Sequence, residues 1–528
     1  MLLTKRSLLA CLLVTFLVAT VCTGAELAVC PGGGSYAAIQ PAIDTAVDGD
    51  EIVVCPGTYT ERIDFLGKLI TVRSEAGAAV TIIDATGLGG AVATFTSAET
   101  SESRLIGFTL TGGAAAVDGG GALISNSSPT IIDCAFVENS AVRFGGGIAC
   151  FGGNPEFVNC VFERNSSSDG GGMRIERSSP LIVGSVYRDN NAVQGAGLMN
   201  ISSSPTVINC QFIGNTATHQ GGGMNNNGPD GAVTSDPLVA NCIFFANSSR
   251  DGGGAMVNNN GASPYIVNCT FFGNWVLSGP GGGMVNGFSS PGQVRVANCI
   301  VWGNSPDEIL STPVGNTVVT NSDIGGGWVG AGNIDVDPLF VDAPAGDLRL
   351  LPESPCIDAG SNEAVPANEP DLDGDGDTDE PLPFDLDGNA RIVGSPQPLV
   401  EIGAYEHTVA ITTVEIDIKP GSYPNSINLG SNGVVPAAIL SSDEFDATNV
   451  DAQSILLAGA GVAVRGNGNR YMAHEEDVNG DGLLDLVIQV ETENLNPEEF
   501  QDGYAILTGE TIDGIAFQGV DEITIVPD

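Results

Sequence analysis

A unit of 25 to 32 residues recurs seven times between Pro129 and Asn304, and a repeat of this length restricts the chain to a stacked, solenoid-like architecture. Its clearest copy runs from Ser204 to Asn215. Each copy has an anchor residue, usually an aromatic residue two positions later, and an asparagine five positions after the anchor; most copies also carry a glycine run. The anchors are Cys134, Cys160, Ser185, Cys210, Cys242, Cys269 and Cys299, and the asparagines are Asn139, Asn165, Asn190, Asn215, Asn247, Asn274 and Asn304.

Alternation inside the unit indicates its secondary structure. Ile208, Cys210 and Phe212 stand two residues apart, which is the side-chain spacing of a β-strand. One such strand cannot bury its apolar face alone, but successive copies stacked about 4.8 Å apart would form columns of like residues. The asparagines of such a column can hydrogen-bond along the stack, at a bend that would otherwise leave backbone groups unpaired. The sequence therefore predicts an all-β parallel β-helix.

The repeat also carries a family resemblance. Phe162 to Asn165, taken with Gly171-Gly172-Met173, resembles the repeat of polymorphic outer-membrane proteins and, more broadly, of bacterial secreted right-handed β-helix proteins. This resemblance implies a pectate-lyase-like fold, a right-handed parallel β-helix. It does not imply lyase activity, because one fold hosts many chemistries.

The segment before the repeats is expected to open and cap the β-helix. Residues 35–47 have helical spacing of apolar side chains, and short strands are expected at 51–55, 69–73 and 80–84. The stretch from Ile39 to Glu61 is similar to the start of many pectate-lyase-like and pectinesterase-like β-helices. That similarity concerns the fold and implies nothing about catalysis.

Residues 1–25 have the three regions of a secretory signal: Lys5 and Arg6, an apolar run from Leu8 to Val21, and small residues up to Ala25. The alternative is a membrane anchor, but the run is shorter than the roughly 20 residues that span a bilayer. No later stretch could span one. We therefore expect an exported protein, secreted or at the cell surface, with no transmembrane segment in its mature form.

The charge balance narrows the class of partner. The chain has 64 Asp and Glu against 18 Lys and Arg, a formal net charge of -46. Nucleic acids and anionic membranes would be repelled, whereas divalent cations would be attracted. The expected partners are an extracellular polysaccharide or a component of the cell surface.

The cysteines fall into two groups. Cys30 and Cys55, each followed directly by Pro-Gly, are the best candidate pair for a disulfide in an exported chain. The six ladder cysteines would point the same way about 4.8 Å apart, farther than the Cβ separation that a disulfide prefers. We expect them to be reduced, buried thiols that act as small apolar fillers.

Two further regions follow the repeats. Four short segments between Asp335 and His407 resemble the choice-of-anchor module that closes many bacterial β-helices. Residues 411–528 contain short apolar runs separated by Gly, Pro and Asn, which favour a β-sandwich. We therefore expect a signal segment at 1–25, a capped β-helix at 26–345, terminal coils at 346–410 and a β-sandwich at 411–528.

Two loops have the oxygen-ligand spacing of calcium sites. The ligand candidates are Asp477, Asn479, Asp481 and Asp485 in one loop, and Asp371, Asp373, Asp375 and Asp379 in the other. Neither has the Glu at position 12 of an EF-hand; the nearer resemblance is to Asp-rich loops of integrin-like and dockerin-like proteins. The expected cofactor is structural Ca²⁺, and the alternative is an acidic, solvated turn.

One outward-facing column suggests a binding surface. Three residues after the anchor, the later repeats place Phe245, Phe272 and Trp302, and stacked exposed aromatics suit flat sugar rings. These three are the candidate glycan-binding residues. The alternative is that an insertion at 228–236 or 306–315 folds over the column and buries it.

Catalytic signatures are weak. A lyase needs an Arg or Lys base beside a metal-binding carboxylate cluster, and the best grouping is a set of arginines near Asp169 and Asp189. That set is Arg143, Arg164, Arg174, Arg177 and Arg188. Arginines alternating with acids are usually surface ion pairs, and the paired aspartates of polygalacturonases are missing. We name no catalytic residue.

Three functions remain open. The preferred one is a non-catalytic, exported β-helix protein that binds glycans or serves as a cell-surface or adhesion protein, stabilised by calcium. The second is a polysaccharide lyase or hydrolase of pectate-lyase-like type. The third is a structural spacer with calcium-stapled loops.

Overall fold

The computed structural model describes residues 24–228, 235–287, 292–312, 316–392, 399–407, 412–466, 470–497, 500 and 503–526. The predicted signal segment, 1–25, lies outside the described residues except for Gly24 and Ala25. The chain forms two compact units, residues 1–407 and 408–528, and each is described by itself.

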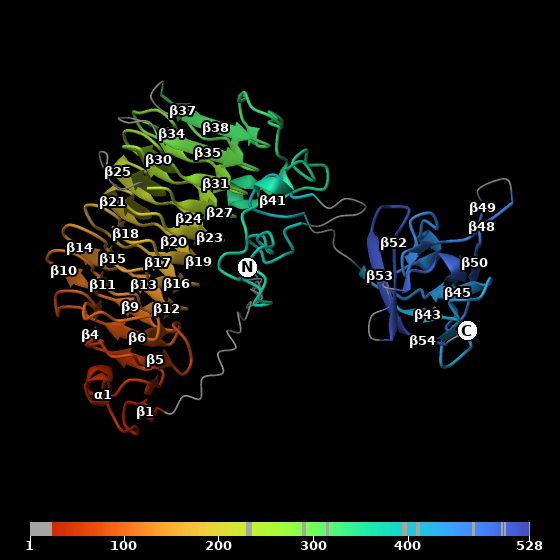
Figure 1. Ribbon diagram of the computed structural model, residues 1–528, viewed down its shortest axis with the longest axis horizontal. Helices are drawn as coiled ribbons and strands as arrows, with labels where there is room; N and C mark the ends of the chain where they lie inside the picture. The colour runs from red at the N-terminus through yellow and green to blue at the C-terminus, as the bar shows by residue number, and fades with distance from the viewer. Residues whose placement is uncertain are drawn as a thin grey trace, which may run out of the picture. The chain divides into compact units, whose positions relative to one another are not determined.

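The first unit is built from three parallel sheets that run along a stack of coils (Figure 1). The 12-stranded sheet contains β1 (Glu26–Val29), β2 (Glu51–Val54), β5 (Thr71–Ser74), β8 (Arg104–Ile106), β12 (Thr130–Ile132), β16 (Glu156–Val158), β19 (Leu181–Val183), β23 (Thr206–Ile208), β27 (Leu238–Ala240), β31 (Tyr265–Val267), β35 (Gln293–Ala297) and β38 (Asn316–Thr320). The 11-stranded sheet contains β3 (Gly57–Tyr59), β6 (Thr81–Asp84), β9 (Thr109–Thr111), β13 (Ala135–Val137), β17 (Val161–Glu163), β20 (Val186–Arg188), β24 (Gln211–Ile213), β28 (Ile243–Phe245), β32 (Thr270–Phe272), β36 (Ile300–Trp302) and β39 (Asp323–Ile324).

The third sheet closes each coil. Its ten strands are β4 (Ile63–Asp64), β7 (Ala93–Phe95), β11 (Ala122–Ser125), β15 (Ile148–Phe151), β18 (Met173–Glu176), β22 (Leu198–Ile201), β26 (Met224–Asn227), β30 (Met256–Asn259), β34 (Met284–Asn286) and β37 (Ile309–Ser311). Smaller parallel ladders pair β10 (Ala114–Ala115) with β14 (Ser140–Ala141), and join β21 (Asn191–Gln194), β25 (Thr216–Gln220), β29 (Ser248–Ser249) and β33 (Trp275–Val276). A parallel β-helix therefore forms, as the repeat predicts.

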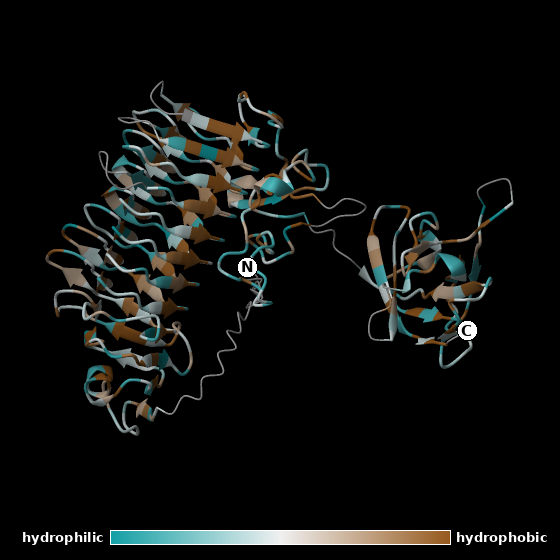
Figure 2. Ribbon diagram, viewed as in Figure 1, coloured by the Kyte–Doolittle hydropathy of each residue, from teal (hydrophilic) through white to brown (hydrophobic). Residues whose placement is uncertain are grey.

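Like residues stack on like along the core. The residues two positions after the anchors form a column of six aromatic rings. The rings are nearly parallel, and neighbouring centroids lie 4.5–5.2 Å apart. The column contains Phe136, Phe162, Tyr187, Phe212, Phe244 and Phe271. All six are fully buried. Figure 2 shows the hydrophobic residues following the stacked strands, with hydrophilic ones in many of the connecting loops.

The repeated asparagines form a second column. From Asn139 to Asn274, each backbone N–H donates to the side-chain oxygen of the next asparagine at 2.9–3.1 Å. At the end of the ladder, Asn304 donates to the carboxylate of Glu308, with Nδ2 at 2.6 Å from Oε2. Burial raises the pKa of Glu308 to about 7. The predicted asparagine stack is confirmed, and Glu308 caps it.

The anchor residues, like the asparagines, hydrogen-bond from one coil to the next. The backbone N–H groups of Cys210, Cys242 and Cys269 each donate to the sulfur of the following anchor at 3.4 Å. Ser185 fits because its hydroxyl accepts the equivalent bond from Cys160, at 3.2 Å. The ladder cysteines are free and buried, and burial raises the pKa of Cys134 to about 12. The ladder cysteines therefore fill the core as small, buried side chains.

The glycine runs have a steric cause. They lie where backbones of consecutive coils approach closely, so a side chain would collide with the next coil. A Cβ on Gly222 would stand 2.3 Å from the carbonyl oxygen of Gly254. The short turn before each anchor needs a left-handed residue, and Asn209 takes this conformation with φ of 54°, which Asn tolerates better than most residues.

The N-terminal end is closed by α1 (Ile39–Thr45), which buries Ile39, Ala42 and Ile43. The Glu61 carboxylate caps this helix by accepting from the backbone N–H groups of Ile39 and Gln40, both at 2.8 Å. The helix is shorter than the predicted span of 35–47, and the side chain of Val47 is 65% exposed. The apolar spacing overestimated its length because only the seven residues of α1, about two turns, cover the open end of the core.

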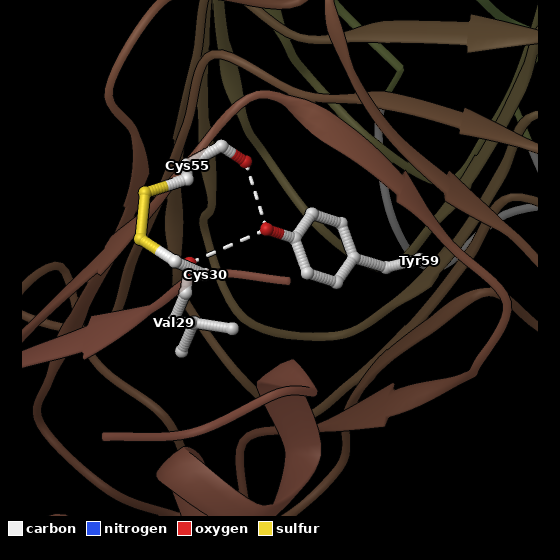
Figure 3. The surroundings of a disulfide bond; sticks show 4 residues. All are labelled: Val29, Cys30, Cys55 and Tyr59. Carbon is white, nitrogen blue, oxygen red and sulfur yellow. Dashed lines mark hydrogen bonds between the residues drawn. A yellow bond between two sulfur atoms is a disulfide. The ribbon is translucent and has the colours of Figure 1, made fainter. Parts of the chain in front are cut away.

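A disulfide joins Cys30 to Cys55 beside this cap, with 5.0 Å between the Cα atoms. The Tyr59 hydroxyl donates toward the carbonyl oxygens of Cys55, at 2.8 Å, and Val29, at 3.3 Å (Figure 3). The disulfide and this hydroxyl tie the first coil to the second.

The end of the first unit folds back on the outside of the β-helix. It contains β40 (Phe340–Asp342) and β41 (Asp347–Leu350), which form an antiparallel pair, and the 3-10 turns η1 (Ala343–Ala345) and η2 (Asn362–Ala364). Two apolar clusters join it to the β-helix: one contains Val267 and Leu382, and the other contains Ile300 and Leu350. We call residues 338–407 the terminal segment.

The second unit has two main sheets around one apolar core. One contains β42 (Thr412–Thr413), β53 (Ala516–Glu522), β52 (Tyr504–Glu510), β46 (Leu456–Leu457) and β47 (Ala460–Gly461). The other contains β43 (Ile416–Ile418), β45 (Val434–Ile439), β51 (Asp485–Glu491) and β50 (Ala473–Glu476). Two short strand pairs complete the unit: β44 (Ser426–Ile427) with β54 (Thr524–Ile525), and β48 (Val464–Arg465) with β49 (Arg470–Tyr471). It also contains the 3-10 turns η3 (Ala447–Asn449) and η4 (Thr492–Asn494). Mostly antiparallel pairing and a shared core fit the predicted sandwich.

Candidate functional site

The predicted glycan-binding column is covered. Phe245, Phe272 and Trp302 lie on the outward side of β28, β32 and β36 and are only half-exposed. The ring of Phe340 packs edge-on against Phe272, with 5.5 Å between centroids, and a side chain at Gly346 would place its Cβ 3.0 Å from Phe245. Trp302 packs against a cluster that includes Leu350 and Ile402. The terminal segment therefore partly covers these three rings, and glycan binding at them stays a prediction.

The covering segment is also different from the one considered in the sequence. Among the described residues, Phe340, Gly346, Leu350 and Ile402 contact or lie beside the column. Most of the insertion at 228–236 and the end of that at 306–315 lie outside the described residues. The physical reason is apolar burial: the three rings supply the large exposed surface that the terminal segment needs to pack against.

The arginines of the predicted lyase cluster are separated and paired with acids. Arg164 and Arg188 lie at the 11-stranded sheet, whereas Arg174 lies on β18 of the 10-stranded sheet. The nearest N–O distances are 2.7 Å for Arg143–Asp118, 3.0 Å for Arg164–Glu138, 2.7 Å for Arg188–Glu163, 3.0 Å for Arg174–Asp169 and 3.8 Å for Arg177–Glu176. Asp189 lies in the turn after β20 with φ of 54°. The predicted set therefore does not converge in one cleft.

Arg174 is the most buried of these arginines. Its side chain is 6% exposed and also pairs with Glu176 at 2.8 Å, while its guanidinium lies 3.4 Å from the ring centroid of Phe144. Burial raises the pKa of Asp169, and Arg174 partly offsets that rise. Two carboxylates and a ring hold this guanidinium, so it is not free to act on a bound sugar.

The structure gathers part of the first acidic loop. One carboxylate oxygen from each of Asp371, Asp373 and Asp375 lies within 4.8 Å of the others. Asp371 also accepts from the backbone N–H groups of Gly374 and Gly376, at 2.7 and 3.0 Å. Asp379, the fourth predicted ligand, is outside this group. Three converging hard oxygen donors suit a divalent cation.

The second acidic loop is organised differently. Asp477 accepts from the backbone N–H groups of Gly480 and Gly482, at 2.8 and 3.2 Å, and Asn479 donates to Asp481 at 2.9 Å. Asp485 is fully buried. Its carboxylate accepts from the N–H groups of Ser441, at 2.8 Å, and Val478, at 2.9 Å. Asp485 therefore braces the loop, and the loop's carboxylates do not form a cluster like that at Asp371.

A hollow of ≈ 390 Å³ lies between the 12-stranded sheet and the terminal segment. Tyr265 and Arg295 occupy paired positions on β31 and β35, and the guanidinium lies 4.6 Å from the tyrosine ring centroid. Thr320 and Glu363 also line the hollow. The Tyr265 hydroxyl donates to the carbonyl oxygen of Ala364 at 2.5 Å, and burial raises its pKa to about 12. This hollow was not predicted from the sequence. The one signal for it was that Tyr265 and Arg295 stand at the same offset before the anchor cysteines of their repeats, which places them side by side in consecutive coils.

A buried charge cluster holds the terminal segment that forms one wall of this hollow. Arg391 and Glu406 are fully buried side chains that pair at 3.2 Å, and Arg391 also donates to the carbonyl oxygen of Gly403. Burial raises the pKa of Glu406 to about 8 and that of Glu401 to about 7. Removing one partner of such a cluster leaves an uncompensated buried charge, so this arrangement fixes the wall in place.

Comparison with known proteins supports the fold of the repeats. The family model of the right handed beta helix region matches residues 71–232 and 121–330. The first unit is a right-handed parallel β-helix. A solved structure that resembles the chain is the crystal structure of pectate lyase Pel9A, with 16% sequence identity, a TM-score of 0.46, and coverage of 73% of this chain and 97% of that one.

No curated protein matches the chain. Within the described part of the chain, none of the helices is long and apolar enough to cross a bilayer. The right-handed β-helix thus gives the fold, and the function has to be argued from the residues that line its surface.

Proposed function

We propose that this chain is an exported, non-catalytic right-handed β-helix protein that binds an extracellular polysaccharide, or another glycan of the cell surface, through the hollow beside Tyr265 and Arg295. The observation that carries the proposal is the free guanidinium of Arg295. No carboxylate of the described residues lies within ion-pair distance of it, although the chain is rich in acids.

The chemistry around Arg295 suits a sugar. The guanidinium offers several fixed donors, Thr320 offers a hydroxyl, and Glu363 offers a carboxylate acceptor. Val318 and Ala297 supply apolar surface beside these polar groups. A few directional polar groups over an apolar floor are typical of small-ligand sites, and a sugar presents both hydroxyl groups and apolar C–H faces.

The experiment is a glycan array with the full chain, followed by titration of the best glycan against Arg295→Gln. We expect the variant to bind about tenfold more weakly, which corresponds to about 1.4 kcal/mol. Arg104→Gln is the matched control, because it removes the same charge from an exposed position on the same sheet. Equal affinity of Arg295→Gln and the control would remove this site from the proposal.

The same samples test the polysaccharide lyase alternative. Each bound glycan is incubated with calcium and the protein, and the unsaturated product of β-elimination is measured by absorbance. The ion pairs of Arg143, Arg164, Arg174, Arg177 and Arg188 support the non-catalytic function, and we expect binding without product. Any unsaturated product would overturn the non-catalytic assignment, and its loss in Arg295→Gln would place the reaction at this hollow.

We also propose that Ca²⁺ binds the loop of Asp371, Asp373 and Asp375 and stabilises the terminal segment. A cation that binds only the folded state adds about 2.7 kcal/mol at a hundred times its dissociation constant. Calcium should therefore raise the thermal midpoint of the full chain, and chelation should lower it. Asp373→Asn should lose most of this shift, whereas Glu102→Gln, an exposed acid elsewhere, should retain it. A calcium response unchanged in Asp373→Asn would place the cation elsewhere, including the loop of Asp477.

A further inference from the structure

The second unit concentrates its positive side chains at one place. Arg465 and Arg470 are the only arginines in residues 408–528, and Lys419 is the only lysine. The ammonium of Lys419 donates to the backbone carbonyl of Ser426 at 2.6 Å. Both arginines, by contrast, line one hollow of ≈ 300 Å³ together with Tyr471, His474 and Gln489.

The strand pairing explains how these residues meet. Arg465 on β48 lies directly opposite Arg470 on β49, so their side chains share one face of the hairpin. The chain continues from β49 through a bend at Met472 into β50, and His474 lines the same hollow, with its Nε2 3.3 Å from a carboxylate oxygen of Glu476. The backbone N–H of Gln489 donates to the carbonyl oxygen of Met472 at 3.0 Å, and β50 pairs with β51. The hollow is therefore built on paired strands.

The two arginines oppose one another without compensation. Like charges directly across a strand pair destabilise it, and among the described residues no carboxylate lies within ion-pair distance of Arg465 or Arg470. The arginines near Asp169 and Asp189 in the first unit are all paired with acids. A bound anion between the two guanidinium groups would remove the repulsion.

The lining narrows the chemistry of that anion. Guanidinium groups bind carboxylates through two parallel hydrogen bonds. Tyr471 offers an aromatic surface whose inner side packs on the core of the unit, and Gln489 offers both a donor and an acceptor. Ligand pockets start at about 300 Å³, so this one fits a small group.

We propose that the hollow formed by Arg465, Arg470, Tyr471 and Gln489 binds a carboxylate-bearing sugar, either a free uronate or a uronate residue within a polysaccharide. The carboxylate lies between the two guanidinium groups, and the sugar ring lies against Tyr471. This site is separate from the hollow at Arg295, so the second unit contributes its own acidic-sugar contact.

The test uses the full chain, with galacturonate and a short oligogalacturonate as probes and a neutral gluco-oligosaccharide as control. Binding is measured by calorimetry, and its position by chemical shifts of the second unit. Arg465→Gln and Arg470→Gln should each weaken uronate binding by roughly tenfold, and raising the salt concentration should weaken it further. Arg295→Gln tests the β-helix hollow, and Arg104→Gln controls for the charge change.

The outcomes separate the possibilities. Stronger binding of the oligomer than of the monomer identifies the polysaccharide as the source, whereas equal binding identifies the free sugar acid. Loss of uronate binding in the Arg465 and Arg470 variants, but not in Arg104→Gln, supports the proposal, whether or not Arg295→Gln also binds more weakly. The proposal is overturned if the chain carrying both Arg465→Gln and Arg470→Gln binds uronate as tightly as the unmodified chain. It is also overturned if the neutral oligosaccharide binds as tightly as the uronate, or if inorganic phosphate or an acidic peptide displaces the uronate at equal concentration.

Discussion

Phe212→Ala is expected to lower the free energy of unfolding by about 4–6 kcal/mol. Phe212 is fully buried in the middle of the aromatic column, between Tyr187 at 4.8 Å and Phe244 at 4.6 Å. Truncating a buried phenylalanine costs about 3–5 kcal/mol, and each stacked ring pair adds about 0.5–1.5 kcal/mol. The next coils are held by hydrogen bonds to their neighbours, so they cannot collapse into the cavity.

The measurement is equilibrium unfolding in urea followed by far-UV circular dichroism, with stability taken from midpoint and slope. Phe212→Leu is the matched variant, because it keeps most of the apolar volume and removes only the ring stacking; its expected cost is about 1–2 kcal/mol. Equal losses for Ala and Leu would show that ring contacts, rather than volume, dominate the column. A loss below about 2 kcal/mol for Ala would contradict a close-packed core.

The second large effect is expected from Asn215→Ala, which interrupts the asparagine ladder. The Asn215 side-chain oxygen accepts from the backbone N–H of Asn190 at 3.1 Å and from its amide at 2.9 Å. Its own amide donates to the carbonyl oxygen of Tyr187 at 2.8 Å. Each buried group that loses its partner costs about 1–3 kcal/mol, so we expect a total loss of about 3–5 kcal/mol.

Gln211→Ala is the control for this variant, since Gln211 belongs to the same coil, points outward and is only half-buried. Its expected cost is below about 0.5 kcal/mol. Hydrogen exchange should also show faster exchange at the backbone amide of Asn190 in Asn215→Ala, because that amide has lost its acceptor. Unchanged protection there, together with a small stability loss, would mean that water replaces the ladder without cost.

The core columns were predictable because they are periodic. Residues at the same offset from each anchor meet the same environment in every coil, so Cys210 over Cys242 and Asn215 beside Asn247 follow from spacing alone. The terminal segment has no such period. Its contact between Phe340 and Phe272 joins residues far apart in the sequence, and this contact partly covers the predicted glycan-binding column.

The candidate sites divide in the same way. Local spacing brought Asp371, Asp373 and Asp375 together, because a short loop with glycine turns fixes its own geometry. One wall of the hollow at Arg295 is formed by residues from Glu363 to Pro366. The hollow at Arg465 and Arg470 is completed by Gln489 of β51, a strand that begins at Asp485. Neither wall can be placed from spacing, since nothing in the sequence states where a non-repeating segment docks.

The amino-acid sequence alone predicted the parallel β-helix, its stacked columns and the loops with carboxylate spacing, because each depends on contacts between residues at fixed separations along the chain. The right-handed sense of the helix came from the family resemblance. Only the tertiary structure decided which surfaces stay open. Apolar burial placed the terminal segment against Phe245, Phe272 and Trp302. The fold also left Arg295 in one hollow, and Arg465 with Arg470 in another, without a carboxylate partner among the described residues, although the chain is rich in acids.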